Sequence, residues 1–229
     1  MEKLEDVEKQ VTDISLDDES LASQTSKDQQ PEFQTSQELT QQNQGKQRKQ
    51  QKQQKPKKDS VEEINKLGFC PLGCSKITLW HKPAIADIKL LKELKGINLI
   101  VTLLYDKENP FPVIEECKNQ DIENFRIPLK GASDATLKDP ENIAMIVEKL
   151  TELFDKLTQK EYNVLIHCSA GVHRTGTIGY TLMRMNGLDQ LQSHEALKQM
   201  REQTFLDVGE NRMQIAEQNY IPLLLKNDL

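Results

Sequence analysis

The stretch YNVLIHCSAGVHRTG, residues 162–176, decides the fold. Its first residues, YNVLI, form a largely apolar run that predicts a buried strand ending near His167. Small residues follow, and a helix is predicted from Arg174 to about Asn186, with Gly187 as its stop. Because ligands of α/β domains bind at the carboxyl edge of the sheet, the turn between strand and helix is the candidate site.

The composition of this turn predicts an anion-binding cradle. Small side chains and a glycine allow a tight curve whose backbone N–H groups point inward, and the helix start adds its own unpaired donors. The residues expected to bind the anion in this way are Ser169, Ala170, Gly171, Val172 and His173, together with Arg174.

Three side chains beside the cradle indicate phosphoryl transfer. Cys168 lies at its base, and a helix N-terminus with a neighbouring cation lowers a cysteine pKa from about 8.5 to roughly 3.5–7.5, so we expect a nucleophilic thiolate. Arg174 offers a planar fork that holds two oxygens of a phosphoryl group. The hydroxyl of Thr175 can donate to the sulfur. A buried, inert thiol is the alternative, and the spacing of cysteine, glycine and arginine argues against it.

The pattern HC-x5-R-T-G, residues 167–176, resembles the signature of the cysteine-dependent protein tyrosine phosphatase superfamily, with its tyrosine-specific and dual-specificity branches. The resemblance covers residues 76–224 by the order of elements. It implies hydrolysis in two steps through a cysteinyl-phosphate, without a metal or another cofactor. His167 is similar to the family's histidine that orients the loop through hydrogen bonds.

The resemblance also implies an aspartate general acid on a loop upstream of the cysteine. The segment PLKGASDATLKDPEN, residues 128–142, contains Asp134 and Asp139. Asp139 precedes Pro140 and a long predicted helix, where an aspartate serves as N-cap. Asp134 has no structural duty that the sequence explains, and its separation from the cysteine resembles the dual-specificity pattern. We therefore predict Asp134 as the acid.

Two glutamines near the carboxyl end carry a weaker resemblance. Gln214 and Gln218 have the four-residue spacing of the family's glutamine pair, which positions the water that attacks the phospho-enzyme. Asn219 separates Gln218 from Tyr220, where the family often has the aromatic residue adjacent. A solvated helix face explains the same residues equally well, and both interpretations stay open.

The order of predicted elements indicates an α/β fold with a central, mostly parallel sheet flanked by helices, as in the protein tyrosine phosphatases. Strands alternate with helices, and the run 97–104 is apolar enough for a strand buried on both faces. Strands are predicted at 76–80, 97–104, 122–129 and 162–168, and helices at 83–96, 113–120, 141–160, 174–186, 193–203 and 210–224.

Residues 1–60 differ in composition from the rest and predict a disordered tail before a catalytic domain at 61–229. The tail carries thirteen glutamines between Gln24 and Gln54, and few aliphatic side chains that could form a core. Residues 1–38 hold 3 Lys+Arg against 11 Asp+Glu, whereas residues 39–60 hold 7 against 1. This split predicts an interaction tail for a protein partner. A solvated linker is a better interpretation of the basic run than a nuclear-import or nucleic-acid patch.

The N-terminus lacks an apolar signal region and no run is long enough to span a bilayer, so we expect a cytosolic or nuclear protein. In that reducing compartment the four cysteines are not expected to form structural disulfides. Cys70 and Cys74 lack the second ligand pair of a zinc site, which favours packing in a loop. A redox role in which one of them protects Cys168 is the minor alternative.

The residues around the cradle favour a phosphoprotein substrate. Relatives that act on phosphoinositides or inositol polyphosphates tend to carry lysines in the loop, and this loop has none. His173 replaces the glycine usual in tyrosine-specific enzymes, and no tyrosine-bearing recognition loop precedes Trp80. We therefore expect a dual-specificity-like enzyme for phosphotyrosine that also accepts phosphoserine and phosphothreonine. The alternatives are a phosphatase of phosphoinositides, inositol phosphates or RNA 5′ ends, and a catalytically silent phosphate-binding scaffold.

Overall fold

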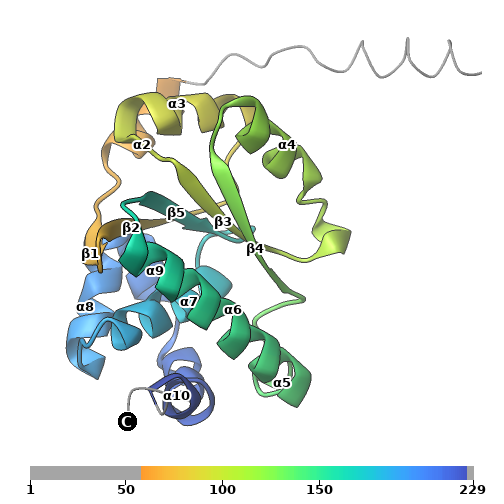
Figure 1. Ribbon diagram of the computed structural model, residues 1–229, viewed down its shortest axis with the longest axis vertical. Coiled ribbons are helices and arrows are strands. Elements are labelled where there is room, and N and C mark those ends of the chain that lie inside the picture. The colour runs from red at the N-terminus through yellow and green to blue at the C-terminus, as the bar shows by residue number, and fades with distance from the viewer. Residues whose placement is uncertain (1–57, 226–229) are drawn as a thin grey trace, which may run out of the picture. The chain divides into compact units, whose positions relative to one another are not determined.

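The computed structural model describes residues 58–225, and within them five strands form one sheet in the order β1-β2-β5-β3-β4 (Figure 1). Except for its last three residues, the predicted tail lies outside the described residues, so its disorder and its partner stay predictions. The strands are β1 (Cys70–Leu72), β2 (Ser75–Trp80), β3 (Leu99–Leu104), β4 (Glu123–Leu129) and β5 (Asn163–His167).

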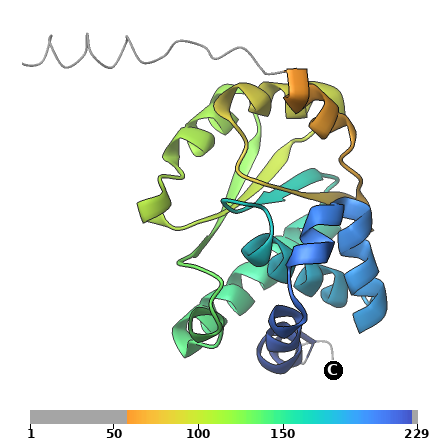
Figure 2. The ribbon, with the colours of Figure 1, turned by 180° about the vertical axis from the view of Figure 1, so that it is seen from behind.

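Helices cover both faces of the sheet, and the view from behind in Figure 2 shows the same layers. One face packs against α2 (Lys58–Asn65), α3 (Ile85–Lys95) and α4 (Phe111–Asn119). On the other side lie α5 (Asp134–Leu137), α6 (Pro140–Gln159), α7 (His173–Met185), α8 (Gln190–Met200), α9 (Glu202–Asp207), α10 (Glu210–Asn219) and α11 (Ile221–Leu224). A short 3-10 helix, η1 (Asp106–Glu108), follows β3. Within residues 58–225 no helix is both long enough and apolar enough to cross a membrane.

The predicted central strand is confirmed. All six residues of β3 are buried, with Leu99, Val101 and Leu103 in the core beneath α6 and α7 and Ile100 in the core beneath α2 to α4. β5 pairs in parallel with β2 and β3, and β3 pairs in parallel with β4, so these four strands end at one edge. The predicted α/β fold is thereby confirmed.

Several helix ends follow local signals. α3 ends at Gly96, which adopts φ +64°, as predicted. Asp139 caps α6, accepting hydrogen bonds from the N–H groups of Glu141 and Asn142, so its predicted structural duty is confirmed. α8 begins earlier than predicted because Asp189 and Gln192 form a capping box.

Two predictions of secondary structure were wrong: the final helix at 210–224 is not continuous, and a strand precedes β2. The structure divides the helix into α10 and α11, because Pro222 lacks the N–H that would donate to residue 218 and its ring crowds that carbonyl. The sequence interpretation also missed α2, α5, α9 and β1. β1 is only three residues long and pairs antiparallel with β2 through a turn at Gly73, so Cys70 belongs to a buried strand rather than a loop.

We expect Glu123, at the start of β4, to make a pH-dependent contribution to the stability of the fold. Its carboxylate accepts hydrogen bonds from Tyr162 (2.9 Å) and Lys160 (3.2 Å) and lies 2.6 Å from Lys156. The Lys156 ammonium is the main reason that the pKa of Glu123 falls to about 2. A depressed folded-state pKa stabilises the fold above the unfolded value, near 4.3, and this stabilisation disappears as the pH falls toward 2.

We expect Glu123→Gln to lower the free energy of unfolding at pH 7 by about 1 kcal/mol, because the carboxylate is partly exposed and screened. The difference from the wild type should shrink between pH 5 and pH 3. Urea unfolding at several pH values measures it, with Glu93→Gln on the exposed face of α3 as the control. A difference that does not change with pH would contradict the assignment.

Candidate active site

Cys168 follows β5 directly and lies at the carboxyl edge of the sheet, as predicted. The residue is 3% exposed, and the N–H of Gly171 donates to its Sγ at 3.3 Å. Gly171 adopts φ +71°, and a Cβ there would lie 2.3 Å from the Trp80 carbonyl oxygen. Only glycine fits this position, because it combines a left-handed conformation with a close backbone approach.

Several groups act on the Cys168 thiol. Burial by itself raises its pKa, but hydrogen bonding by the Thr175 hydroxyl and N–H, the Arg174 charge and the Gly171 N–H outweigh burial and lower it. The Thr175 hydroxyl is fully buried and has no other hydrogen-bond partner of standard geometry among residues 58–225. It is therefore free to donate to the sulfur, as its place in the sequence predicted.

Arg174 lies in the first turn of α7, and Glu108 of η1 holds its guanidinium. Nη1 lies 2.5 Å from Oε2 of Glu108, and Nη2 lies 2.7 Å from Oε1, which makes a bidentate pair. The Arg174 side chain is 10% exposed and that of Glu108 is 32% exposed. Hydrogen bonding from Arg174 is the main reason that the pKa of Glu108 is lowered. The sequence interpretation missed Glu108.

One edge of the Arg174 fork stays free for a ligand. Nη1 also donates to the carbonyl oxygens of Leu129 (2.9 Å) and Leu103 (3.3 Å), so both of its N–H groups are engaged. Nε and the second N–H of Nη2 have no oxygen acceptor in the part of the chain that the structure describes, and the Cys168 sulfur is the other group besides Glu108 that acts on the guanidinium. These two donors share one side of the planar group, which matches two oxygens of a phosphoryl group.

Lys82 connects η1 to the loop that follows Cys168. Its backbone N–H donates to the Ser169 carbonyl at 2.9 Å. Its ammonium donates to the carbonyls of Glu108 (3.3 Å) and Asn109 (3.2 Å). Lys82 follows β2, so the carboxyl end of that strand also helps to place Glu108 and the loop.

Two further side chains hold the outer surface of the loop. Arg201, between α8 and α9, donates from Nη1 to the carbonyls of Gly171 (2.7 Å) and Ala170 (3.1 Å). The Thr204 hydroxyl donates to the same Gly171 carbonyl at 2.7 Å. In a trans peptide the C=O and the N–H point in opposite directions. Because these carbonyls point toward Arg201 and Thr204, the N–H groups of the same peptide units point the other way, into the loop. These contacts thus support the predicted cradle.

Asp134 is the first residue of α5, on the loop that begins where β4 ends at Leu129. Nδ2 of Asn211 lies 2.7 and 2.8 Å from its two carboxylate oxygens, and Lys138 lies at 3.6 Å. The Asn211 hydrogen bond is the main reason that the pKa of Asp134 is lowered. The predicted acid is thus exposed and held in its ionised form in the ligand-free protein.

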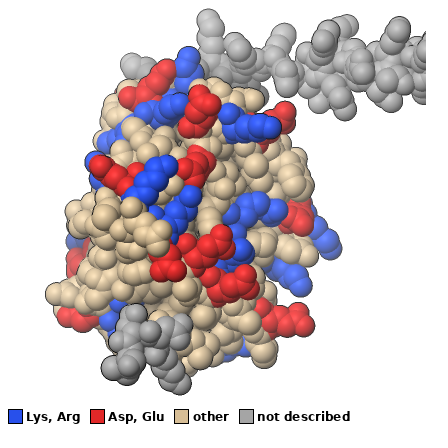
Figure 3. All heavy atoms as spheres, viewed as in Figure 1, with Lys and Arg blue, Asp and Glu red and all other residues tan. Residues whose placement is uncertain are grey.

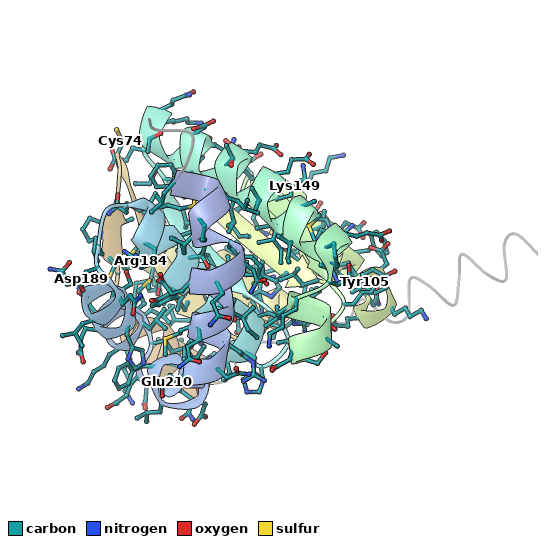
Figure 4. The ribbon with its side chains drawn as sticks, turned by 90° about the horizontal axis from the view of Figure 1, so that it is seen from below. Cys74, Tyr105, Lys149, Arg184, Asp189 and Glu210 are labelled. Carbon is teal, nitrogen blue, oxygen red and sulfur yellow. The ribbon has the colours of Figure 1, made fainter. Side chains whose placement is uncertain are left out.

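Arg212, in the first turn of α10, acts on both the loop that carries Asp134 and the anion cradle at residues 169–174. Its Nε donates to the Ala132 carbonyl at 3.1 Å. Its charge helps to lower the pKa of Asp134, and after burial it is the next cause of the lowered pKa of His173. One guanidinium therefore lies within electrostatic reach of both segments. Figure 4 shows the helix that begins at the labelled Glu210.

Among residues 58–225, neither predicted glutamine makes a hydrogen bond to Cys168 or to the loop that follows it. Gln214 and Gln218 are both exposed on α10, and Gln214 donates to Glu210 at 3.1 Å. The residues of this segment that reach the site are Asn211 and Arg212, one turn earlier. Among the loop residues, Ser169, Ala170 and His173 are exposed, Val172 is half-buried and Gly171 is buried.

A comparison with protein-family models identifies the family of this chain. The family model described as dual specificity phosphatase, catalytic domain, matches residues 79–218. The chain belongs to the dual specificity phosphatase family. The resemblance drawn from the motif at 167–176 is thereby confirmed, and the protein is a phosphatase of the cysteine-dependent superfamily. A comparison with curated proteins finds no match.

Solved structures similar to this dual specificity phosphatase include three other phosphatases. Tk-PTP in the active form is 20% identical, with a TM-score of 0.47 over 65% of this chain and 92% of its own. The core catalytic domain of the PP-IP phosphatase SIW14 from S. cerevisiae, in complex with citrate, is 17% identical, with a TM-score of 0.49 over 70% and 91%. PTPMT1 is 16% identical, with a TM-score of 0.48 over 66% and 94%.

Proposed function

We propose that this phosphatase hydrolyses phosphotyrosine in proteins, and phosphoserine and phosphothreonine more slowly, through a cysteinyl-phosphate. Cys168 is the nucleophile, Arg174 and the loop N–H groups bind the phosphate, and Asp134 is the general acid. The single observation that carries the proposal is the buried Cys168 at the base of a loop whose only fixed positive charge is Arg174.

In the first step the Cys168 thiolate attacks phosphorus, and the bond from phosphorus to the ester oxygen breaks. The lowered pKa of Cys168 raises the fraction of thiolate at neutral pH. The free edge of Arg174 holds two of the phosphoryl oxygens as their charge redistributes. Protonated Asp134 transfers its proton to the leaving oxygen, which departs as a neutral hydroxyl.

In the second step a water molecule attacks the cysteinyl-phosphate, and the Asp134 carboxylate accepts the proton from that water. The bond between sulfur and phosphorus breaks, and inorganic phosphate forms. Donors from Gly171 and Thr175 stabilise the departing thiolate. Asp134 is again protonated and ready for the next substrate.

Asp134 is ionised in the free protein, so it must take up its catalytic proton when the substrate binds. Its lowered pKa depends first on Asn211, and the charges of Lys138 and Arg212 add to it. A dianionic phosphate near the carboxylate disfavours its charged form and raises its pKa. The proton that the acid needs is therefore taken up most readily when substrate is bound.

The neighbouring cations support a substrate with a single phosphate. Lys82, Arg201 and Arg212 all lie near the loop, but each donates to backbone carbonyls. Phosphoinositides and inositol polyphosphates carry further phosphates that would need free cations. Figure 3 shows one face of the molecule, on which basic and acidic side chains are interspersed.

The surroundings of Cys168 support an aryl phosphate as the preferred ester. The sulfur is almost fully buried, so the ester must reach inward from the substrate backbone. Phosphotyrosine extends farther from the main chain than phosphoserine does. Half-buried Tyr105, labelled in Figure 4, follows β3 at the same edge, and the Lys130 ammonium lies 5.8 Å from its ring centroid. An aromatic ring at this edge offers a surface for the substrate ring.

Phosphate release by the full chain tests the proposal. The panel comprises phosphotyrosine and phosphothreonine in one peptide sequence, a phosphoinositide, an inositol polyphosphate and an RNA 5′-triphosphate. We expect the phosphotyrosine peptide to have the highest kcat/KM. A higher value for a lipid, an inositol phosphate or RNA would overturn the assignment. Phosphate binding without release from any substrate would instead support a silent scaffold.

Glu108 should orient Arg174 for this reaction. We expect Glu108→Gln to lower kcat/KM for a phosphotyrosine peptide about tenfold, equivalent to ~1.4 kcal/mol. The charged hydrogen bonds to Arg174 are lost, so the free energy of unfolding should fall by about 1–3 kcal/mol. Steady-state kinetics and urea unfolding measure the two effects.

Asp106→Asn is the matched control for Glu108→Gln, because Asp106 lies on the same short helix and pairs with Arg126 at an exposed position. It should change kcat/KM less than twofold, as expected for a surface pair. Equal losses in the two variants would show that η1 as a whole, rather than the Glu108 carboxylate, supports activity.

A further inference from the structure

A series of hydrogen bonds, half-buried at Asn124 and buried at Thr102 and His167, runs from β4 through β3 to the end of β5. Nδ2 of Asn124 donates to Oγ1 of Thr102 at 2.9 Å. Oγ1 of Thr102 lies 3.1 Å from Nε2 of His167, and Nδ1 of His167 lies 3.1 Å from the Cys168 carbonyl oxygen. Thr102 and His167 are both 0% exposed. The series thus ends on the backbone of the nucleophile.

The direction of each hydrogen bond follows from its fixed ends. A carbonyl only accepts, so Nδ1 of His167 carries the proton and donates to Cys168. Burial lowers the pKa of His167 to about 4, so the ring is neutral and Nε2 is an acceptor. The Thr102 hydroxyl must then donate to Nε2, and its oxygen accepts from the Asn124 amide. Every member has one consistent role.

This direction matters for the phosphate loop. The C=O and N–H of a trans peptide point in opposite directions, so fixing the Cys168 carbonyl on His167 points the Ser169 N–H away from the ring. Ser169 is the first residue of the anion cradle. If His167 adopted its other tautomer, the unprotonated Nδ1 would face the Cys168 carbonyl, and two lone pairs would repel each other.

We propose that Thr102 and Asn124 are positioning residues, which hold His167 in one tautomer and thereby orient the peptide between Cys168 and Ser169. The inference rests on the proposed function for its catalytic consequence. Its structural content concerns only Cys168 and phosphate binding. Neither residue touches the reacting atoms.

A second buried threonine, Thr78, provides a comparison for the hydrogen bonding of Thr102. Thr78 on β2 is also 0% exposed, and its Oγ1 has no hydrogen-bond partner among the residues from 58 to 225. The sheet accommodates such a hydroxyl without a partner. At Thr102, by contrast, the hydroxyl accepts from one side chain and donates to another.

Charged groups act on the end of these hydrogen bonds that is nearest the nucleophile. Lys82 and His81, after β2, and Arg174 of α7 act electrostatically on His167. Arg174 and Arg201 act on Cys168. Substitution of Thr102 or Asn124 leaves all of these charges in place, so a change in Cys168 reactivity can be traced to the hydrogen bonds.

The test measures the alkylation rate of Cys168 by iodoacetamide across pH, resolved from the other cysteines by peptide mass spectrometry. We expect Thr102→Val to slow alkylation at pH 6 by about threefold to tenfold and to move the midpoint of its pH dependence upward. Protection of Cys168 by inorganic phosphate should require severalfold more phosphate. Nitrogen chemical shifts of the His167 ring should report a loss of the single Nδ1–H tautomer.

Two matched variants keep the proposal falsifiable. Thr102→Ser retains the hydroxyl and should restore the wild-type alkylation rate within about twofold, whereas Thr78→Val removes a buried hydroxyl outside the series and should change nothing. Equal rates for Thr102→Val and the wild type would overturn the proposal. It would also fail if Thr102→Ser were as slow as Thr102→Val, because the cause would then be packing.

Alkylation needs no substrate, so this experiment separates the inference from the proposed function. A wild-type protein that releases no phosphate but shows the expected ranking of alkylation rates would overturn the function and support the positioning role. An active wild-type protein with equal alkylation rates in all variants would support the proposed function and overturn the positioning role of Thr102 and Asn124.

Discussion

Replacement of Cys168 by serine is expected to lower phosphate release by roughly 10⁴-fold or more while leaving phosphate binding intact. A serine hydroxyl does not ionise near neutral pH, so the donors that lower the pKa of the thiol cannot produce a comparable nucleophile. The free edge of Arg174 and the loop N–H groups remain in place. Turnover of a phosphotyrosine peptide and calorimetric binding of inorganic phosphate give the two readouts.

Cys74→Ser is the control for this change. Cys74 is exposed, and its Sγ lies 3.0 Å from the Thr158 carbonyl, to which a serine hydroxyl can also donate. This variant should keep the wild-type rate. Wild-type turnover by Cys168→Ser would refute the cysteinyl-phosphate mechanism. Loss of phosphate binding together with turnover would mean that the substitution disturbs the loop itself.

Asp134→Asn is expected to lower kcat by about 10²- to 10⁴-fold for esters with poor leaving groups. The effect should be smaller for 4-nitrophenyl phosphate, because its leaving oxygen needs less help from a proton. The pH profile of kcat/KM should also change. In the wild type it rises as Cys168 ionises and falls as Asp134 loses its proton, and both pKa values lie below their ordinary values in the free enzyme. The falling limb should disappear in the variant.

Asp139→Asn is the control that tests which of the two aspartates of this loop is the general acid. Asparagine is as good an N-cap as aspartate, so α6 should keep its start and only the charge is lost. We expect kcat to stay within about twofold of the wild type. The reverse ranking, with Asp139→Asn severely impaired and Asp134→Asn active, would make Asp139 the general acid.

Local sequence patterns determined much of this protein. The apolar runs predicted β3 and β5, and the turn chemistry placed Cys168 directly after β5 and Arg174 at the start of α7, because these features depend on residues that are neighbours in the chain. The N-cap at Asp139 left Asp134 as the candidate acid for the same reason. Gly171 was recognisable as a turn residue, although its contact with Trp80 was not.

The partners of these residues were decided by the tertiary structure alone. Glu108 lies 66 positions from Arg174, Asn211 lies 77 from Asp134, and Thr102 lies 65 from His167. In the sequence each has the appearance of an ordinary polar residue. The glutamine pair on α10 had the expected spacing, but the hydrogen bonds from this helix to the Asp134 loop come from Asn211 and Arg212. Spacing along one helix reports which residues share a face, but the face turned toward a distant loop depends on how the whole chain packs.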